Sequence, residues 1–385
     1  MILSAKEFLS IALQRFLSFV AGFVPLRRRL IVFCNYNGRG YGDSLGPIAD
    51  ELLRRGVNCS MVWLVNDLNV SIPASIKKVK RGRFVERIYL AMAKIVISNT
   101  KGGLVYSKKR CAYYIQTWHG DMPFKHIEAE CGKILPAYYT WLSKFDSCKT
   151  DFFISGSSLL SDIARRAFWY LQTCKICEYG NPRKDVFFRT SEAKMREFKQ
   201  NMFGGASVRV ALYAPTFRSN IPNEACRIDA NALQKSLVEK FGGQWIVVIR
   251  LHPNVANRSD MFTYDDQIVN GTKIDDGQLL SMAAELLISD YSSVIEDFVI
   301  QRKPVFLYTP DINEYQTKER KLRDLYFKLP FPRCETECNL RKAIVDFDDK
   351  AYQTALGDFV ECDYRVFDDG HASERVVDLI EKLMA

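Results

Sequence analysis

Short apolar runs alternate with helix-like segments along this chain, and the alternation occurs twice. Runs such as Leu30–Cys34 and Met61–Val65 are too short for helices and predict buried strands, whereas Leu45–Arg55 has apolar residues at helical spacing. A second series begins near Ser207, after the Gly204–Gly205 break. Strands that alternate with helices form parallel sheets covered by helices on both faces. The pattern therefore predicts an α/β protein of two doubly wound domains that face a central cleft.

The remaining elements follow the same pattern. In the first series, strands are predicted at Ile95–Ser98, Tyr113–Gln116 and Asp151–Ser155, and helices at Phe84–Lys94 and Ser157–Phe168. In the second, strands are predicted at Val208–Tyr213, Trp245–Leu251, Leu286–Ser289 and Pro304–Tyr308, and helices at Ala230–Phe241, Ser293–Gln301 and Ala372–Met384. We expect an N-terminal domain over residues 27–190 and a C-terminal domain over residues 205–385, preceded by a segment of residues 1–26.

The segment of residues 1–26 is rich in apolar residues, but Gln14 and Arg15 interrupt them. No apolar run reaches the ~20 residues that cross a bilayer, and no small-residue cleavage site of a signal peptide follows. An amphipathic helix followed by Arg27–Arg29 suits the anionic inner face of a membrane, which predicts a cytoplasmic protein bound peripherally there. A helix packed on the protein's own core explains the pattern equally well.

Basic residues outnumber acidic ones by 54 to 45, and a net charge of +9 favours a polyanionic partner. Neither Arg27–Arg29 nor Lys77–Arg83 interleaves aromatic residues as a nucleic-acid platform does, so no nucleic acid is expected and Lys77–Arg83 reads as a solvated loop. Eleven scattered cysteines indicate reduced thiols. Cys174 and Cys177 form a CxxC without a second pair at zinc-ribbon spacing, which favours buried thiols over a metal site.

Ligands of doubly wound sheets bind at the carboxyl ends of the strands, and both His119 and His252 directly follow predicted strands. Ser292 and Ser293 lie where a strand turns into a helix, and their hydroxyls and the first helical amides suit a phosphate. Plain helix capping by either serine is the alternative. Thr216 also follows a strand.

Three arginines are placed to converge on phosphate oxygens: Arg183 at a turn, Arg218 after a strand and Arg250 near the end of a strand. Other chemistries lack their usual motifs, because the chain contains no GxxxxGK[ST], GxGxxG behind the first strand, HExxH or GxSxG. These absences weaken kinase, dehydrogenase, zincin and hydrolase interpretations.

The run QTWHGDMPFK at residues 116–125 resembles the QTWHGTPLK signature of the CDP-glycerol glycerophosphotransferase family, whose members build teichoic acids and related polyol-phosphate chains. GNPRKD, LYAPTFR, RLHP and ISDYSSVIEDF follow in the family's order and resemble its GYPRND, LYAPTWR, RLHP and ISDYSSVMFDF. The likeness extends from about Leu30 to the end of the chain. It implies a GT-B-like enzyme of two Rossmann-like domains that transfers glycerol phosphate from CDP-glycerol to an acceptor hydroxyl and releases CMP.

By position, the resemblance makes His119 the general base and His252 a second catalytic candidate. Donor contacts are implied for Trp118, Gly120, Asp121, Arg183, Thr216, Arg218, Arg250, His252, Ser292, Ser293 and Asp297. Two departures leave the native donor open, since Asp121 replaces the usual Thr and Asn181 the usual Tyr. A carboxylate beside His119 would raise the pKa of the imidazole or contact a polyol hydroxyl.

The expected partners are CDP-glycerol or another CDP-polyol, a polyprenyl-linked or polymeric acceptor, and an anionic membrane surface. No metal site is predicted and no cofactor is certain; a divalent cation stays open because no carboxylate cluster with metal spacing stands out. Two other functions remain: a GT-B glycosyltransferase that uses a nucleotide sugar, and a non-catalytic nucleotide-binding module.

Overall fold

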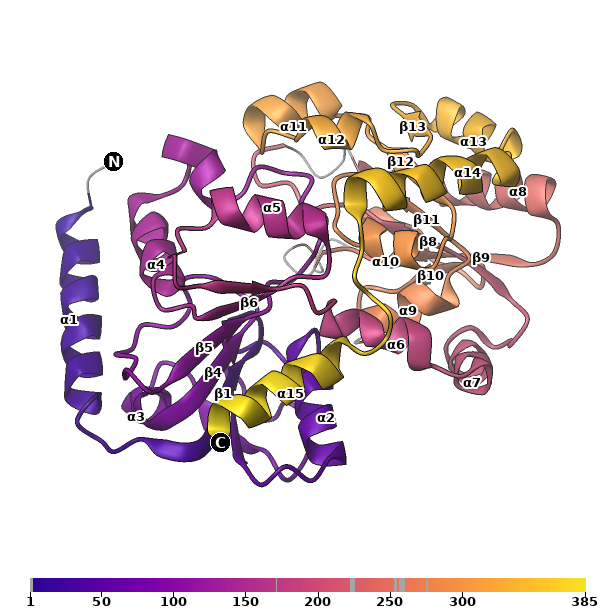
Figure 1. The fold of residues 1–385 in the computed structure, drawn as a ribbon. Coiled ribbons are helices and arrows are strands. Elements are labelled where there is room, and N and C mark those ends of the chain that lie inside the picture. The colour runs from indigo at the N-terminus through magenta and orange to yellow at the C-terminus, as the bar shows by residue number, and fades with distance from the viewer. Residues whose placement is uncertain (1–2, 171, 222–225, 253–254, 256–259, 275) are drawn as a thin grey trace. The chain divides into compact units, whose positions relative to one another are not determined.

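The computed structural model describes residues 3–170, 172–221, 226–252, 255, 260–274 and 276–385, which form two compact units (Figure 1). Unit 1 comprises Met1–Asp121, Ile127–Asp185 and Val366–Ala385, and unit 2 comprises Met122–His126 and Val186–Arg365. The predicted domain boundaries differ from these units at several points: the segment of residues 1–26 is part of unit 1, and residues 186–190 belong to unit 2. Residues 366–385 belong to unit 1 rather than to the C-terminal domain, and residues 122–126 belong to unit 2.

A carboxylate explains why the C-terminal segment returns to unit 1. Asp185 accepts hydrogen bonds from the backbone N–H groups of Ala372 and Ser373, at 3.0 and 2.8 Å, at the start of the last helix. It therefore satisfies amides that have no partner within the helix and places a negative charge at the positive end of the helix dipole.

Unit 1 contains a seven-stranded parallel sheet in the order β3-β2-β1-β4-β5-β6-β7. Its strands are β1 (Arg27–Cys34), β2 (Ser60–Val65), β3 (Lys77–Lys80), β4 (Ala93–Ser98), β5 (Tyr113–Gln116), β6 (Phe152–Ile154) and β7 (Lys175–Cys177). Its helices are α1 (Ala5–Ala21), α2 (Leu45–Arg54), α3 (Phe84–Met92), α4 (Ala137–Ser147), α5 (Ser158–Ala167), α6 (Asp185–Arg189, which continues into unit 2) and α15 (Ala372–Met384), with short 3₁₀ turns η1 (Asn35–Asn37), η2 (Glu128–Ile134) and η3 (Pro182–Lys184).

The two faces of this sheet are covered by different helices, because successive side chains of a strand point in opposite directions. Ile31 and Phe33 of β1 pack with residues of α2 and α15, including Val376. Leu30 and Val32 of the same strand pack on the other face with residues of α3. The sheet is therefore doubly wound.

Unit 2 contains a six-stranded parallel sheet in the order β10-β9-β8-β11-β12-β13. Its strands are β8 (Arg209–Ala214), β9 (Trp245–Ile249), β10 (Ile268–Asn270), β11 (Leu286–Ser289), β12 (Val305–Tyr308) and β13 (Arg333–Cys334). Its helices are α7 (Glu192–Phe203), α8 (Ala230–Phe241), α9 (Gly277–Ala283), α10 (Ile295–Ile300), α11 (Ile312–Lys318), α12 (Asp324–Phe327), α13 (Glu337–Val345) and α14 (Asp349–Phe359), followed by the π-helical turn η6 (Val360–Tyr364).

Within each sheet, the first six strands by sequence have the spatial order 3-2-1-4-5-6 of a dinucleotide-binding fold. The predicted architecture of two doubly wound Rossmann-like domains is thus confirmed. A central cleft between them stays a prediction. One local prediction is wrong: Lys77–Lys80 of the basic run is not a loop but the edge strand β3, paired with β2.

Helix α1 is fixed to unit 1 by its polar side. Ser18 donates a hydrogen bond to the Val105 carbonyl oxygen at 2.8 Å, and Gln14 donates to the Tyr138 hydroxyl at 2.9 Å. The other side carries apolar side chains that are between 41% and 77% exposed, namely Phe8, Leu9, Leu13, Phe16, Phe19 and Val20, with Phe23 after the helix.

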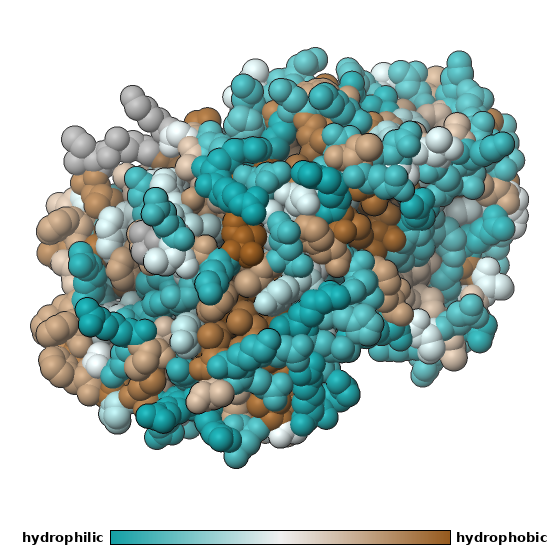
Figure 2. Space-filling view, viewed as in Figure 1, coloured by the Kyte–Doolittle hydropathy of each residue, from teal (hydrophilic) through white to brown (hydrophobic). Residues whose placement is uncertain are grey.

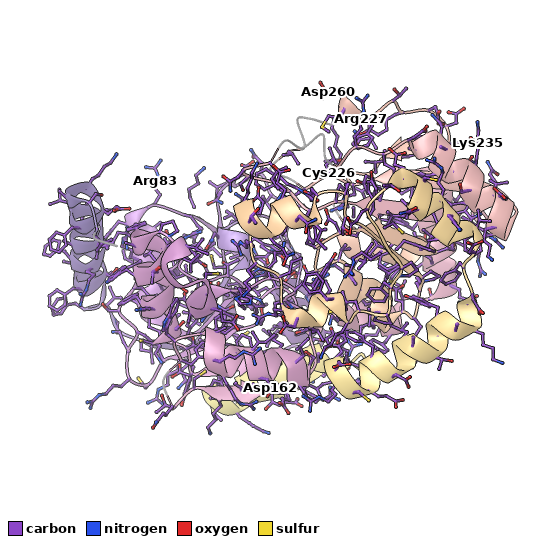
Figure 3. All side chains as sticks on the ribbon, turned by 90° about the horizontal axis from the view of Figure 1, so that it is seen from above. Arg83, Asp162, Cys226, Arg227, Lys235 and Asp260 are labelled. Carbon is purple, nitrogen blue, oxygen red and sulfur yellow. The ribbon has the colours of Figure 1, made fainter. Side chains whose placement is uncertain are left out.

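Apolar side chains gather at the left edge of the molecule in Figure 2, where α1 lies in Figure 1, and Figure 3 shows α1 side chains extending away from the rest of unit 1. The helix thus packs on its own unit, as one of the two interpretations predicts, and still presents an apolar surface. Binding of this surface to a membrane stays a prediction. No helix among the described residues has both the length and the hydropathy to cross a membrane.

Candidate active site

The strand order reverses next to the first strand of each sheet, and ligands of such sheets bind at the carboxyl ends of the strands on either side of that point. In unit 1 these strands are β1 and β4, and in unit 2 they are β8 and β11. The residues that follow these strands are therefore expected to form the ligand site of each unit.

His119 follows β5, and its ring is oriented by the chain that leaves β4. Its Nδ1 atom lies 2.8 Å from the backbone carbonyl oxygen of Asn99. Because a carbonyl can only accept, Nδ1 carries the hydrogen and Nε2 keeps the lone pair that a general base needs. Burial lowers the pKa of His119 from its ordinary value, opposed by the Asn99 carbonyl and by Asp43. The imidazole is therefore neutral at pH 7.

Sequence reasoning missed three polar residues that surround His119. The ring of Tyr36 lies 5.9 Å from the His119 ring, centroid to centroid, and its hydroxyl donates to Asp43 at 2.9 Å. Asn99 donates to the other carboxylate oxygen of Asp43 at 3.0 Å. The Arg183 guanidinium approaches the same carboxylate, with Nε 4.0 Å from Oδ2. The signal was available, because Tyr36, Asp43 and Asn99 come shortly after the predicted strands that form β1 and β4.

Trp118 supports this turn rather than exposing its ring. Its backbone has φ +55°, and its N–H donates to the Gln116 side-chain oxygen at 3.0 Å. The indole is buried edge-on against Phe168, with the ring centroids 4.8 Å apart. Gly120 is buried as well. The implied donor contact of Trp118 stays a prediction, and its packing explains how the chain holds His119 in place.

Asp121 lies in a buried cluster of charges. Its carboxylate accepts from Lys184 Nζ at 2.6 Å, from Asn181 Nδ2 at 2.9 Å and from the Gly156 N–H at 3.1 Å. A Cβ atom on Gly156 would lie 2.2 Å from Asp121 Oδ2, so only glycine fits beside the carboxylate. Lys184 also pairs with Asp368 at 3.1 Å, and burial raises the pKa of Asp368 to about 6.

This arrangement corrects one expectation from the sequence. Asp121 does not raise the pKa of His119, because its charge is compensated by Lys184 and the net shift of the His119 pKa is downward. Asp121 and Asn181, the two departures from the family pattern, contact each other directly. Both therefore belong to the same buried cluster.

In unit 2, Thr216 and Arg218 follow β8 and meet a carboxylate from the next strand. The backbone N–H of Thr216 donates to both oxygens of Asp290, at 2.9 and 3.0 Å. Arg218 donates to Asp290 at 2.5 Å and forms a two-pronged pair with Asp311, at 2.9 and 3.0 Å. The Arg218 guanidinium therefore connects the loop after β8 with the loops that carry Asp290 and Asp311. Its contact with a pyrophosphate stays a prediction. The Thr216 hydroxyl is buried and has no hydrogen-bond partner among the described residues.

The end of β9 carries Arg250 and His252. Arg250 donates to the carbonyl oxygens of Gly271 and Ile274, at 3.1 and 2.5 Å, which fixes the loop after β10. His252 is exposed, and its ring stacks on Phe217 with the centroids 5.8 Å apart. The residues that follow it, 253–254, lie outside the described part of the chain.

Ser292 and Ser293 are half-buried in the turn between β11 and α10. The helix-capping alternative is not seen, since α10 has no side-chain cap and Ser292 only accepts from the Val294 N–H at 3.4 Å. Asp297 is buried within α10, with 1% of its surface exposed. The serine hydroxyls thus remain candidates for ligand contacts, and the implied donor contact of Asp297 stays a prediction.

No group of three or more His, Cys, Asp or Glu side chains within the described ranges is arranged to hold a metal ion. Cys174 and Cys177 are free thiols, and burial raises the pKa of Cys174 to about 12. The residues described above supply a neutral, oriented imidazole in unit 1 and hydroxyls at the strand ends of unit 2, which suit acid–base and electrostatic catalysis.

Comparison with known proteins covers nearly the whole chain. A teichoic acid poly(glycerol phosphate) polymerase from Staphylococcus epidermidis is 28% identical over 375 residues, which are 93% of this chain and 51% of the polymerase. A teichoic acid glycerol-phosphate transferase from Staphylococcus aureus is 26% identical over 369 residues, 92% of this chain and 93% of that protein. The chain thus spans about half the length of the first relative.

The solved structure of the wall teichoic acid polymerase TagF superposes with a TM-score of 0.83 at 25% identity, over 98% of this chain and 96% of that one. The GT-B-like fold expected from the motifs is confirmed. The model of the family described as CDP-glycerol:poly(glycerophosphate) glycerophosphotransferase matches residues 16–382. This match spans both sheets and every motif discussed above, and the chain accordingly belongs to the CDP-glycerol:poly(glycerophosphate) glycerophosphotransferase family.

Proposed function

We propose that this protein transfers a polyol phosphate, with glycerol phosphate the first candidate, from a CDP-polyol to a hydroxyl of a teichoic-acid-type acceptor. Family membership supports the reaction class. The observation that carries the assignment is His119, whose Nδ1–H is held by the Asn99 carbonyl while Nε2 stays basic. A neutral, oriented imidazole is the group that deprotonation of an attacking alcohol requires.

In the proposed reaction, the acceptor oxygen attacks the phosphorus that bears the polyol, and its proton passes to Nε2 of His119. The bond between that phosphorus and the bridging oxygen breaks, and CMP leaves with the bridging oxygen. Charge that develops on the phosphates needs fixed donors. The Thr216 hydroxyl, which has no partner among the described residues, and Ser292 and Ser293, which do not cap α10, support this role for unit 2.

The positioning of His119 rests on residues that do not themselves react. Asn99 and Asp43 hold the chain beside the imidazole, and Asp43 also faces Arg183. We propose that Asp121 is also a positioning residue that does not react, because its carboxylate already accepts hydrogen bonds from Lys184 and Asn181. Arg183 is the cation of unit 1 that we expect to meet a donor phosphate.

The decisive experiment offers CDP-glycerol, CDP-ribitol and UDP-sugars to the protein with a synthetic polyprenyl-linked acceptor. We expect release of CMP and a product heavier by one or more polyol phosphates in mass spectra. Transfer from a UDP-sugar alone would assign a glycosyltransferase instead. Nucleotide binding without any product across all donors would indicate a binding module.

We further propose that the protein works on the cytoplasmic face of the membrane, where a polyprenyl-linked acceptor is located. The exposed apolar side of α1 and the exposed Arg27–Arg29 that begin β1 support this placement. Replacing Phe8 and Leu13 by Ser should reduce sedimentation with phosphatidylglycerol vesicles. Replacing two exposed phenylalanines of unit 2, Phe188 and Phe327, is the matched control. Equal sedimentation of both variants would contradict the placement.

A further inference from the structure

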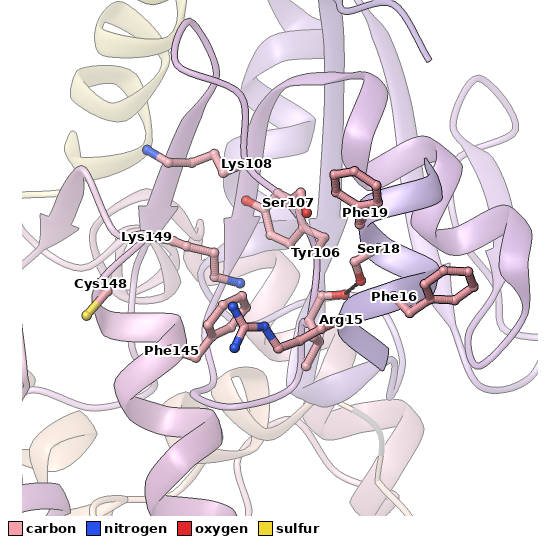
Figure 4. Close-up of a pocket in the computed structure, with 11 residues that line it drawn as sticks. Arg15, Phe16, Ser18, Phe19, Tyr106, Ser107, Lys108, Phe145, Cys148 and Lys149 are labelled. Carbon is pink, nitrogen blue, oxygen red and sulfur yellow. Dashed lines mark hydrogen bonds between the residues drawn. The ribbon is translucent and has the colours of Figure 1, made fainter. Parts of the chain in front are cut away.

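A cavity of about 610 Å³ lies in unit 1 between α1, the chain that enters β5 and the end of α4 (Figure 4). Its volume is within the ~300–1,000 Å³ typical of ligand pockets. Its walls combine aromatic rings with cationic groups, and it is separate from the residues grouped around His119. Its main lining residues are Arg15, Phe16, Phe19, Tyr106, Phe145 and Lys149.

Among the described residues, three cations and no carboxylate line this cavity: Arg15, Lys108 and Lys149. Lys108 forms an ion pair at 2.5 Å with Asp151, which does not line the cavity. For Arg15 and Lys149, no carboxylate of the described residues lies within ion-pair distance. A cavity with uncompensated positive charge and no acidic wall favours an anion.

Lys149 is the most constrained of these cations. Only 8% of the residue is exposed, its Nζ donates to the Leu104 carbonyl at 2.7 Å, and it lies over the ring of Phe145 at 4.6 Å. Burial lowers the pKa of Lys149 to about 8, with Asp146 opposing the shift. Beside it, the Tyr106 hydroxyl is buried without a hydrogen-bond partner in the described part of the chain. The ammonium of Lys149 has three N–H donors, of which the Leu104 carbonyl accepts one, so it can still donate to a phosphate oxygen.

The apolar part of the lining points to a chain attached to that anion. Phe16 and Phe19 line the cavity and are each 62% exposed, so they also belong to the apolar surface of α1. An apolar tail that leaves the cavity would therefore continue along this surface rather than into water. A free phosphate or sugar phosphate would make no use of these rings.

We propose that this cavity binds the phosphate head group and the first chain segment of an anionic membrane phospholipid. The proposal rests on the membrane placement in the proposed function and deepens it. The apolar side of α1 would bind the bilayer without selecting a lipid, whereas the cavity would bind one lipid molecule per chain. Arg15 and Lys149 would contact the phosphate, and Phe16 and Phe19 the chain.

The test uses the full chain and monomeric dihexanoyl-phosphatidylglycerol, kept below its micelle concentration and titrated by calorimetry. We expect saturable binding of one lipid per chain. Arg15→Gln should weaken this binding about ten-fold, because a charge-assisted hydrogen bond is lost. Arg196→Gln removes the same charge from an exposed site on α7 of unit 2 and should leave affinity unchanged. Melting curves show that each variant is folded, and the exposed Arg15 is chosen for that reason.

Two further ligands identify what the cavity recognises. Dihexanoyl-phosphatidylcholine, which lacks the net charge, and glycerol 3-phosphate, which lacks the chains, should each bind more than ten-fold more weakly. Any one of three results would overturn the proposal. These are the absence of saturable lipid binding, equal effects of the two arginine variants, and binding of glycerol 3-phosphate as tight as that of the lipid. CMP release with a soluble acceptor is measured in parallel. If CMP is released while lipid binding fails, only the lipid site is refuted; if no CMP is released, the proposed function fails whatever the lipid does.

Discussion

The buried ammonium of Lys184 provides a sharp test of how unit 1 is held together. Its Nζ lies 2.6 Å from Asp121 and 3.1 Å from Asp368, and none of these three side chains is more than 2% exposed. Lys184→Met keeps the length of the side chain and leaves two buried carboxylates without their cation. Removing one partner of a buried ion pair costs about 3–5 kcal/mol, and we expect the free energy of unfolding to fall by that amount.

The neighbouring variants should differ in a defined order. Asp121→Asn preserves the volume and leaves Lys184 paired with Asp368, so we expect a loss of about 1–3 kcal/mol, the size of a hydrogen bond to a charged group. Lys175→Met removes an exposed ammonium from β7 of the same unit. It should change stability by less than about 0.5 kcal/mol and is the matched control.

The assay is urea unfolding followed by circular dichroism and tryptophan fluorescence. Burial raises the pKa of Asp368 to about 6 with Lys184 present, and loss of the ammonium raises it further. The folded Lys184→Met variant then holds a proton that the unfolded chain releases, so its deficit should shrink as the pH falls from 7 towards 4. A deficit within 1 kcal/mol of the Lys175→Met value, or one that grows on acidification, would refute the argument.

Three further predictions concern the proposed reaction. His119→Ala should lower turnover by ~10²–10⁴-fold with little change in CDP-glycerol affinity, and turnover within a few-fold of wild type would remove His119 from the base role. Because burial lowers the pKa of His119, turnover should fall on the acid side only below pH 6.5, as the imidazole gains a proton; a limb centred above 6.5 would contradict this. Ser292→Ala and Ser293→Ala should weaken donor binding by ~1.5–3 kcal/mol each without lowering the melting temperature, since α10 has no side-chain cap. Loss of stability with unchanged donor affinity would assign the serines to capping instead.

The parts of the fold that the sequence predicts are those in which an apolar run or an apolar helix face packs into the core. The bounds of β5, β11, α8 and α15 match the predicted ranges, because an uninterrupted apolar run or a 3.6-residue period reports burial directly. Strand β3 was missed for the same reason. Its sequence KKVK buries one residue of four, so lysine side chains of a sheet edge read as a solvated loop.

The site divides in a similar way. His119 could be predicted because it follows an apolar run and lies in a recognisable motif. The partners of Arg218 could not, since Asp290 and Asp311 are 72 and 93 positions away and no local pattern links them. Asp121 shows the same limit: its neighbour His119 suggested a shared electrostatic role, whereas the fold pairs it with Lys184, 63 residues later.

Because residues 366–385 belong to unit 1, the two units are completed in the opposite order to that in which their first residues are synthesised. Chains emerge N-terminus first, and domains generally fold in that order. Here the face of the first sheet that carries Ile31 and Phe33 is covered by α15, which is synthesised only after all of unit 2. Unit 2 needs only Met122–His126 from upstream, and those residues are already present when its last strand emerges. The half that is made first is therefore completed last, once α15 has been synthesised.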